Sequence, residues 1–407
     1  MFLRIAFKNL WRNKRRAFLT ELAIVFGIVV IVFTGAFLKG FLRFWAQNQF
    51  IEATTGAFQI EHNEYQTKKF LDPLNTTLTN SAALIADVEQ MPGIVAAYGE
   101  LRMTGIVSNG SKSVIFDGKG VDKAKQAQVL PRTDELLKAG RQLGDDLYEV
   151  VLGELLAETL DAHIGSQVKI VVKTLQGGVD LMYATVVGVK SGGHFPAATY
   201  LEINLAQAQK FLRMPDRVSQ ILARTDSFDR SLQYARDVET RLQLANHPIV
   251  VRNYTELIEM FVTVGGVFQL IAYIISLILL IIVGFGIANA MFMAVRERRK
   301  EIGTLLAIGM EPAQARRLFL LEGALVGMSG AIIGTLIAVG MTTALNQHGG
   351  IRLYASPIGS YINISPAIDW SVIGLAGVLI FGVSLAASWL PAAASARLNP
   401  VDALMEA

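Results

Sequence analysis

Four long stretches without a charged residue limit what this 407-residue chain can fold into more than any other feature. They contain 17, 36, 29 and 27 residues and lie between Glu21 and Lys39, Glu259 and Arg296, Glu322 and Arg352, and Asp369 and Arg397. A helix of about 20 apolar residues crosses the hydrocarbon core of a bilayer. The pattern therefore predicts an α-helical membrane protein with four transmembrane helices, and the low charged fraction, 17%, agrees with it.

The distribution of lysine and arginine predicts the orientation of these spans, because both residues concentrate on the cytoplasmic side. Residues 1–16 hold six of them and no acidic residue, whereas the loop after the third span holds only Arg352. The loop after the second span holds six more, which are Arg296, Arg298, Arg299, Lys300, Arg316 and Arg317. Both termini and this middle loop are therefore predicted to be cytoplasmic, and residues 41–261 to face outward.

The charge pattern and the four uncharged runs give the predicted segments of the chain. These are a cytoplasmic interfacial helix at 1–16, transmembrane spans at 17–40, 262–295, 318–345 and 369–391, an extracytoplasmic domain at 41–261, a cytoplasmic loop at 296–317, an outer loop at 346–368 and a cytoplasmic tail at 392–407. The first span is interpreted as retained, because no small-residue cleavage site follows it. The interfacial helix is predicted from one apolar face, formed by Leu3, Phe7, Leu10 and Trp11.

Residues 41–261 are predicted to form a large α+β domain inserted between the first and second spans. Runs of β-forming residues predict strands at 57–61, 94–108, 112–118, 167–174 and 182–190, and amphipathic spacing predicts helices at 81–91, 153–162 and 228–244. Gly177 and Gly178 suggest a hairpin turn between the last two strands. A stalk helix is predicted to begin near Asn253, with Glu256 completing its cap, and to continue into the second span.

The sequence shows no convincing arrangement for catalysis or metal binding. It contains no cysteine, and its five histidines lack the spacing of metal ligands. Ser166 and Lys169 have the spacing of a serine–lysine pair, but they lead into a predicted strand rather than a helix. No charged residue lies near the centre of spans two to four, where an ion-coupled transporter usually carries one. A membrane-bound hydrolase is therefore a weak alternative.

The cytoplasmic loop at 296–317 carries the clearest functional signal. It is predicted to extend the second span as a short helix that stops at Gly309, with a new helix starting at Pro312. An exposed apolar patch with a charged flank is predicted at Ile302, Leu305, Leu306 and Met310 and at Arg298, Lys300 and Glu301. Because exposed apolar patches mark interaction sites, we expect a docking surface for a cytoplasmic partner.

This loop resembles that of the FtsX/MacB-type (type VII) ABC transporter permeases, which carry the signature R-x-R-E-I-G-x-L-x-A-x-G and a glutamate in the next helix. The matching residues are Arg298, Arg299, Lys300, Glu301, Ile302, Gly303, Leu305, Ala307 and Gly309, followed by Glu322. Two further runs are similar to the family, at Gly153, Leu156, Leu160, Gly165 and Val168, and at Pro391, Ala392, Ala396, Pro400, Ala403 and Leu404. Lys300, where arginine is commoner, and Met310-Glu311 are departures from the pattern.

The resemblance implies a permease subunit without enzymatic activity of its own. In this family two identical or related permeases pair in the membrane, and a separate cytoplasmic ATPase dimer docks on the loop after the second span. ATP and Mg²⁺ would be bound by that ATPase, and no cofactor is expected on this chain. The expected docking residues are Arg298, Lys300, Glu301, Ile302, Gly303, Leu305, Leu306, Ala307, Gly309 and Met310.

The resemblance also implies how the ATPase would act on the rest of the chain. Closure of the ATPase dimer would be relayed through the membrane to the extracytoplasmic domain, a mechanism called mechanotransmission. In the family this domain has an α/β porter part and a smaller β-rich insertion, placed here near 146–196. The expected location is the bacterial inner membrane, with the large domain in the periplasm, and nucleic acid is not an expected partner.

Several functions remain open within this family. The lipoprotein-release (LolC/LolE-like) branch is favoured, because its permeases and ATPase are separate chains and its permeases have about this length. Membrane lipid, lipoproteins and a periplasmic chaperone are the partners it would imply, although Gly177-Gly178 leaves little room for the family's chaperone-capturing hook. The alternatives are export of drugs, lipids or peptides and an FtsX-like signalling permease that transports nothing. A pocket for acyl chains between spans one and two of paired subunits is predicted at Phe26, Phe33, Phe37, Phe268, Ile271 and Ile275, and simple packing or lipid contact is the alternative for each.

Overall fold

The computed structural model describes residues 14–69, 73–191, 199–245, 247–355 and 360–397. Within it the chain divides into two compact units, which we call the membrane unit (Met1–Arg43 with Thr263–Ala407) and the inserted domain (Phe44–Val262). Residues 1–13 of the predicted interfacial helix lie outside the described residues, as do Pro400, Ala403 and Leu404 of the C-terminal pattern. The two units are described separately below.

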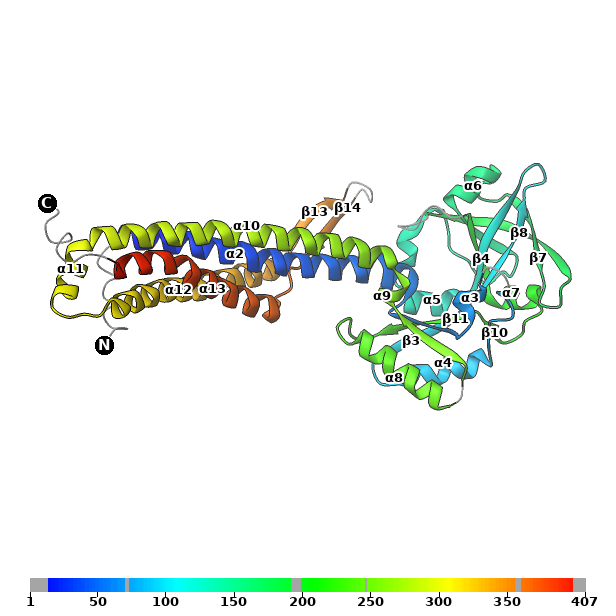
Figure 1. Cartoon of the computed structure of the whole chain (residues 1–407). Helices are drawn as coiled ribbons and strands as arrows, with labels where there is room; N and C mark the ends of the chain where they lie inside the picture. The colour runs from blue at the N-terminus through cyan, green and yellow to red at the C-terminus, as the bar shows by residue number, and fades with distance from the viewer. Residues whose placement is uncertain (1–13, 70–72, 192–198, 246, 356–359, 398–407) are drawn as a thin grey trace. The chain divides into compact units, whose positions relative to one another are not determined.

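In its described ranges the membrane unit contains four long helices and one short one (Figure 1). They are α2 (Lys14–Phe44), α10 (Glu259–Glu297), α11 (Arg299–Ala307), α12 (Pro312–Gln347) and α13 (Trp370–Ala396). The four long helices are long and apolar enough to cross a membrane, which confirms the predicted spans. The helices extend past the predicted span ends, and α13 continues through Pro391. The predicted outer loop at 346–368 also contains an unpredicted antiparallel hairpin of β13 (Ile351–Ala355) and β14 (Ser360–Ile364).

Small residues bring the helices of the membrane unit close together. A Cβ atom added to Gly323 of α12 would lie 1.9 Å from the Ser388 hydroxyl of α13, and one added to Gly327 would lie 2.5 Å from Ser384. Lipid supplies no hydrophobic force between helices, so close backbone approach at such residues is the main route to association. The α12–α13 pair is therefore the most tightly joined part of this unit.

The inserted domain begins with the π-helix η1 (Trp45–Thr55) and ends with the short helix α9 (Tyr254–Leu257). Its strands are β1 (Phe58–His62), β2 (Leu78–Thr79), β3 (Ile94–Ser108), β4 (Ser113–Val121), β5 (Leu137–Gly140), β6 (Glu149–Gly153), β7 (Gln167–Lys173), β8 (Val179–Lys190), β9 (Tyr200–Asn204), β10 (Arg217–Val218), β11 (Gln220–Thr225) and β12 (Ile249–Asn253). Its other helices are α3 (Tyr65–Lys68), α4 (Ser81–Glu89), α5 (Lys123–Val129), the 3-10 helix η2 (Thr133–Leu136), α6 (Glu154–Leu160), α7 (Leu205–Leu212) and α8 (Ser231–Leu244). This mixture confirms the predicted α+β class.

One ten-stranded sheet organises the inserted domain, in the order β12-β1-β11-β3-β4-β9-β6-β8-β5. Strand β7 lies off this path and pairs with both β3 and β8, so that β3, β4, β9, β6, β8 and β7 close into a six-stranded barrel. The predicted hairpin at Gly177-Gly178 is confirmed as the β7–β8 connection, with a positive φ at Gly177. The range 146–196 supplies β6, β7 and β8, but β3, β4 and β9 from outside it complete the barrel.

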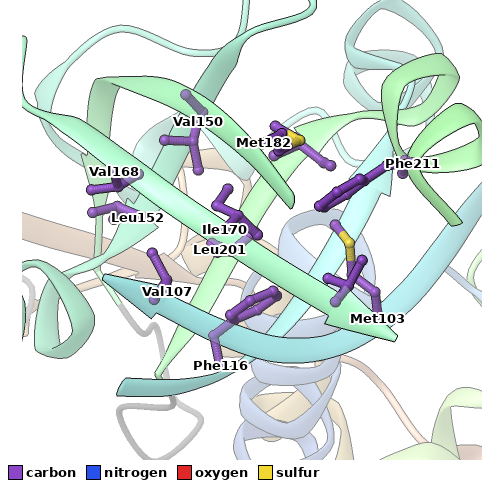
Figure 2. Packing of buried hydrophobic residues seen from close by; sticks show 14 of the residues in the cluster. Met103, Val107, Phe116, Val150, Leu152, Val168, Ile170, Met182, Leu201 and Phe211 are labelled. Carbon is purple, nitrogen blue, oxygen red and sulfur yellow. The ribbon is translucent and has the colours of Figure 1, made fainter. Parts of the chain in front are cut away.

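Alternate side chains of the barrel strands fill its interior (Figure 2). The interior residues include Met103, Val107, Phe116, Val150, Leu152, Val168, Ile170, Met182 and Leu201, all of them buried. A second core lies where β1, β11 and β12 are covered by α4 and α8. Because β3 is 15 residues long and pairs with β11 at one end and with β4 and β7 at the other, it joins both cores.

Buried charges also lie on four strands of the barrel, β3, β4, β8 and β9. The Lys190 ammonium contacts the Glu202 carboxylate at 2.5 Å, and both side chains are almost fully buried. Lys119 lies 3.5 Å from both Glu202 and Glu100. Burial alone would raise the pKa of Glu202, but the two lysines outweigh it and lower that pKa to about 2. Glu202 is therefore an ionised carboxylate, paired with both lysines, at neutral pH.

The predicted stalk differs from the structure at one residue. Asn253 caps a helix as predicted, and its side chain accepts a hydrogen bond from the Thr255 N–H and donates one to Glu256. However, that helix, α9, ends at Leu257, and Ile258 leaves the helical conformation before α10 begins. The prediction of a continuous helix is wrong, because Ile258 turns its side chain into the second core, where it is 3% exposed.

Candidate functional site

The short helix α11 lies between α10 and α12, at one end of the membrane unit (Figure 1). The chain leaves α10 at Arg298, whose ψ of 16° breaks the helix, and α11 then runs to Ala307. Gly309 adopts a φ of +104°, which allows the Met310 N–H to donate to the Leu305 carbonyl at 3.0 Å. Glu311 and Gln314 then form a reciprocal capping box at the start of α12. The predicted stop and restart of the chain here are both present in the structure.

One face of α11 packs inward and the other faces solvent. Ile302 is 4% exposed and belongs to the same buried cluster as Val295 and Phe319. The prediction that Ile302 is part of an exposed patch is therefore wrong, and Gly303 beside it is buried as well. Leu305, Leu306 and Met310 are half-buried, whereas Lys300, Glu301, Ala307 and Gly309 are exposed.

The most exposed apolar side chain of this loop was missed by the sequence analysis. Ile308 is 76% exposed, immediately after the last residue of α11. The sequence signal for its exposure was its position directly before Gly309, which ends the helix. A residue at that position lies outside the helical periodicity that turns Ile302 inward. The exposed surface of the loop is therefore an apolar tip, Ala307–Gly309, beside the charged residues Lys300 and Glu301.

A buried ion pair lies beneath α11. The Arg298 guanidinium contacts the Glu322 carboxylate of α12 at 2.9 Å, and the two side chains are only 13% and 5% exposed. The same guanidinium lies 5.6 Å from the centre of the Phe319 ring and 3.3 Å from the exposed carboxylate of Glu301. Arg298 was expected among the docking residues, but its side chain points into the chain rather than outward.

The predicted acyl-chain residues are only partly brought together. Phe37 and Phe268 both contact Phe41, at ring-centre distances of 6.3 and 5.7 Å, and Phe41 was not among the predicted residues. Phe26 is 63% exposed, and Ile271 and Ile275 are exposed on α10. Across the described side chains of α10 from Thr263 to Leu279, none is buried, whereas Leu280, Val283, Ile287, Met291 and Val295 are buried further along.

Comparison with known proteins identifies the family. A family model described as the FtsX-like permease C-terminal domain matches residues 273–400, and one described as the MacB-like periplasmic core domain matches residues 17–241, more than half of the chain. The chain belongs to the FtsX/MacB-type ABC transporter permeases. The resemblance seen in the sequence is thereby confirmed, and the protein is a membrane subunit of an ABC transporter.

Three relatives of this permease agree with that assignment. An uncharacterized ABC transporter permease of Methanocaldococcus jannaschii is 24% identical, with 98% of this chain and 96% of that protein covered. The lipoprotein-releasing system transmembrane protein LolE of Haemophilus influenzae is 25% identical, with 95% and 93% covered. The macrolide export ATP-binding/permease protein MacB 1/2 of Paracoccus denitrificans is also 25% identical, but this permease spans only 58% of it.

The other residues considered for chemistry have structural contacts in the permease. The Ser166 hydroxyl accepts a hydrogen bond from the His163 N–H at 3.0 Å, and no bond joins it to Lys169 in the described part of the chain. Across the described ranges no cluster of three His, Asp or Glu side chains is arranged to hold a metal ion.

Proposed function

We propose that this permease docks a separate cytoplasmic ATPase on the exposed tip of its α11 loop and transmits the ATPase's motion to the inserted domain. The observation that carries this proposal is Ile308, a large apolar side chain that is 76% exposed on a loop otherwise tightly ordered by caps and a buried ion pair. An apolar residue in such a position suits burial in the groove of a partner protein. ATP and Mg²⁺ would be bound by that partner.

Replacing Ile308 with aspartate tests this docking. The ABC ATPase that co-purifies with the tagged wild-type permease from native membranes should be lost from Ile308→Asp, because the charge would be buried at the interface. Leu244→Asp is the matched control, since Leu244 is 81% exposed on the inserted domain. Half-buried Leu306 is less suitable, because it packs against the core of the membrane unit. Unchanged ATPase recovery with Ile308→Asp would refute the docking proposal.

For the transported substrate, we propose lipoproteins that are released from the outer leaflet of the inner membrane. The similarity to two lipoprotein-releasing proteins, LolE at 25% identity over 95% of this chain and LolC at 23% over 81%, supports this choice. The test reconstitutes the ATPase–permease complex in liposomes and measures ATP hydrolysis with added lipoprotein. Stimulation by a triacylated lipoprotein supports the proposal, stimulation by macrolides, lipids or peptides would replace it with export, and no stimulation by any of them would favour an FtsX-like signalling role.

The proposed orientation places both termini in the cytoplasm and the inserted domain in the periplasm. The basic residues around α11 and in residues 1–16 support it, since the loop at 346–368 holds only Arg352. Because the chain contains no cysteine, single cysteines can report on each side. A membrane-impermeant maleimide should label Ser111→Cys in intact spheroplasts and should label Thr304→Cys only after lysis, and the reverse result would invert the topology.

An extracytoplasmic partner protein, such as a chaperone, has a suitable surface on the outside of the barrel. Ile115, Ile106, Val171 and Leu181 lie side by side across β4, β3, β7 and β8. Ile115 and Leu181 are 73% and 50% exposed, and Lys169 and Lys173 flank Val171 on its strand. This surface suits a partner with apolar side chains between carboxylates. Ile115→Lys should weaken capture of such a protein from periplasmic extract, whereas Leu244→Lys should not.

A further inference from the structure

A charged pair buried beneath α11 has no role in the docking surface described above. Arg298 and Glu322 are both nearly covered, whereas Ala307, Ile308 and Gly309 at the tip of the loop are exposed. A buried ion pair adds little net stability, because desolvation of both charges offsets their attraction. Where such a pair is retained, fixing one arrangement of the chain is its best-attested use.

Arg298 stands where two helices meet. Its backbone N–H donates to the Ala294 carbonyl of α10 at 3.2 Å, and its carbonyl accepts from the Ile302 N–H of α11 at 2.9 Å. The residue therefore belongs to the hydrogen-bond ladders of both helices, although its ψ of 16° bends the chain between them. Its side chain joins this bend to α12, through the contacts with Glu322 and Phe319.

Glu322 precedes a close contact between α12 and α13. The next residue, Gly323, has room for no side chain, because a Cβ there would lie 1.9 Å from the Ser388 hydroxyl of α13. The Ser384 hydroxyl of α13 also donates to the Gly323 carbonyl. The backbone that carries Glu322 is therefore held against α13, so the carboxylate projects from a closely packed helix.

We propose that Arg298 and Glu322 are positioning residues that fix the angle of α11 against α10 and α12. This inference rests on the proposed function, since it assigns a purpose to the rigidity of the docked loop. A push on the tip at Ile308 would then move α10 and the α12–α13 pair together. Without the ion pair, α11 would tilt about Arg298 and the push would be absorbed at the bend.

The first experiment needs no ATPase. Because the chain has no cysteine, nitroxide labels can be attached at Asn289→Cys on α10 and Thr304→Cys on α11, which are both exposed positions. Double electron–electron resonance then measures the distance between the two labels, which changes with the angle of the bend. The wild-type pair should give one narrow distance distribution, and Glu322→Gln should broaden it. The swap Arg298→Glu with Glu322→Arg should narrow it again. Glu301→Gln is the matched control, since Glu301 also contacts Arg298 but is 45% exposed and lies on α11 itself.

The second experiment uses the complex of the permease with its co-purifying ATPase. Glu322→Gln should keep ATPase binding and basal ATP hydrolysis, but should lower the substrate-stimulated rate by roughly tenfold, as expected when a coupling free energy is lost. A variant that unfolds would instead lose ATPase binding and its sharp elution profile, and the charge swap then decides the question. An unchanged label distribution in Glu322→Gln would overturn the positioning role. Failure of any ATPase to bind the wild-type permease would overturn the proposed function and leave the label result standing.

Discussion

The inserted domain buries large apolar side chains and several charges in closed cores, whereas the membrane unit joins its helices through glycine and serine and leaves many apolar side chains exposed. In water the burial of apolar surface drives folding, so a barrel filled with Phe116, Met182 and Leu201 is stable by its own contacts. In lipid that force is absent between helices, and close approach has to replace it. We therefore expect the two regions to fail through different substitutions.

The same contrast bears on how motion would pass through the protein. The half of α10 nearer its C-terminus is packed, with Val283, Ile287 and Met291 buried, whereas no described side chain from Thr263 to Leu279 is buried. A helix packed over half its length can move as a lever only if its packed end is held firmly. The Arg298–Glu322 contact lies just beyond that packed end.

The largest expected effect is in the inserted domain, at the buried charges. Lys190→Met should lower the free energy of unfolding by about 3–5 kcal/mol, because it leaves Glu202 buried without its closest partner. Urea unfolding of the purified protein, followed by tryptophan fluorescence, measures this loss. Lys138→Met is the control, since Lys138 pairs with Glu154 at an exposed site and its loss should cost no more than about 1 kcal/mol.

The double variant Lys190→Met with Glu202→Leu makes the same test from the opposite direction. Replacing both charges of a buried pair by apolar groups is often neutral, so much of the lost stability should return. If the double variant were as unstable as Lys190→Met alone, Lys190 and Glu202 would stabilise the domain through the packing of their side chains rather than through their charges.

A pH dependence of the inserted domain should follow from the same carboxylate. The pKa of Glu202 is lowered to about 2 in the folded chain, against 4.5 for an ordinary glutamate. The unfolded chain therefore takes up the proton first as the pH falls. This contribution to stability, on the order of 3 kcal/mol, is fully present above pH 4.5 and is lost as the pH falls through about 2.

Equilibrium unfolding at several pH values between neutral and strongly acidic solution measures this contribution. In the variant without both charges, Lys190→Met with Glu202→Leu, the free energy of unfolding should fall less as the pH falls, because the contribution of Glu202 is absent. If the free energy of unfolding changed with pH equally in the two proteins, the acid sensitivity would belong to other carboxylates.

Along α12 and α13 of the membrane unit the sensitive positions should be glycines at helix contacts. Gly323→Val should destabilise the unit by about 1–3 kcal/mol or more, because the added atoms meet Ser388 where the helices cannot separate cheaply. Gly340→Val on the same helix has open space around it and should cost much less. Thermal unfolding in detergent, read by the loss of the monodisperse elution peak, compares the two. Equal midpoints would show that α12 and α13 are held by something other than close packing.

The sequence was most informative where one simple pattern decided the structure. Uncharged length alone located all four spans, and alternating β-branched residues located β3, β7 and β8. Strand β6 was missed because all five of its residues are buried, which removes the alternation that marks a strand with one solvent face. The closure of the barrel was equally hidden, since it depends on β7 pairing with β3, far away along the chain.

The candidate site shows the same limit on a smaller scale. The break at Gly309 and the restart at Pro312 could be predicted, because glycine and proline act locally. The inward packing of Ile302 could not, because it depends on Phe319 of the following helix. The pairing of Arg298 with Glu322 was hidden for the same reason, although both residues belong to the recognised pattern.

The smallest expected effect should be similar in both regions, because it is the loss of a helix cap at an exposed site in each. Asp122 accepts hydrogen bonds from the N–H groups of Ala124 and Lys125 at the start of α5, and Asp369 accepts one from Ser371 at the start of α13. Asp122→Ala and Asp369→Ala should each cost about 1 kcal/mol, measured by the same unfolding assays.

The Lys39 ammonium also contacts Asp369, at 2.8 Å, but half of the Lys39 side chain is exposed, so that contact should add less than about 1 kcal/mol. Lys39→Met isolates this part, because it leaves the cap intact. If Asp369→Ala cost several times more than Asp122→Ala while Lys39→Met cost little, capping itself would be stronger in the membrane unit. The contrast between the two regions would then extend beyond side-chain packing to the ends of their helices.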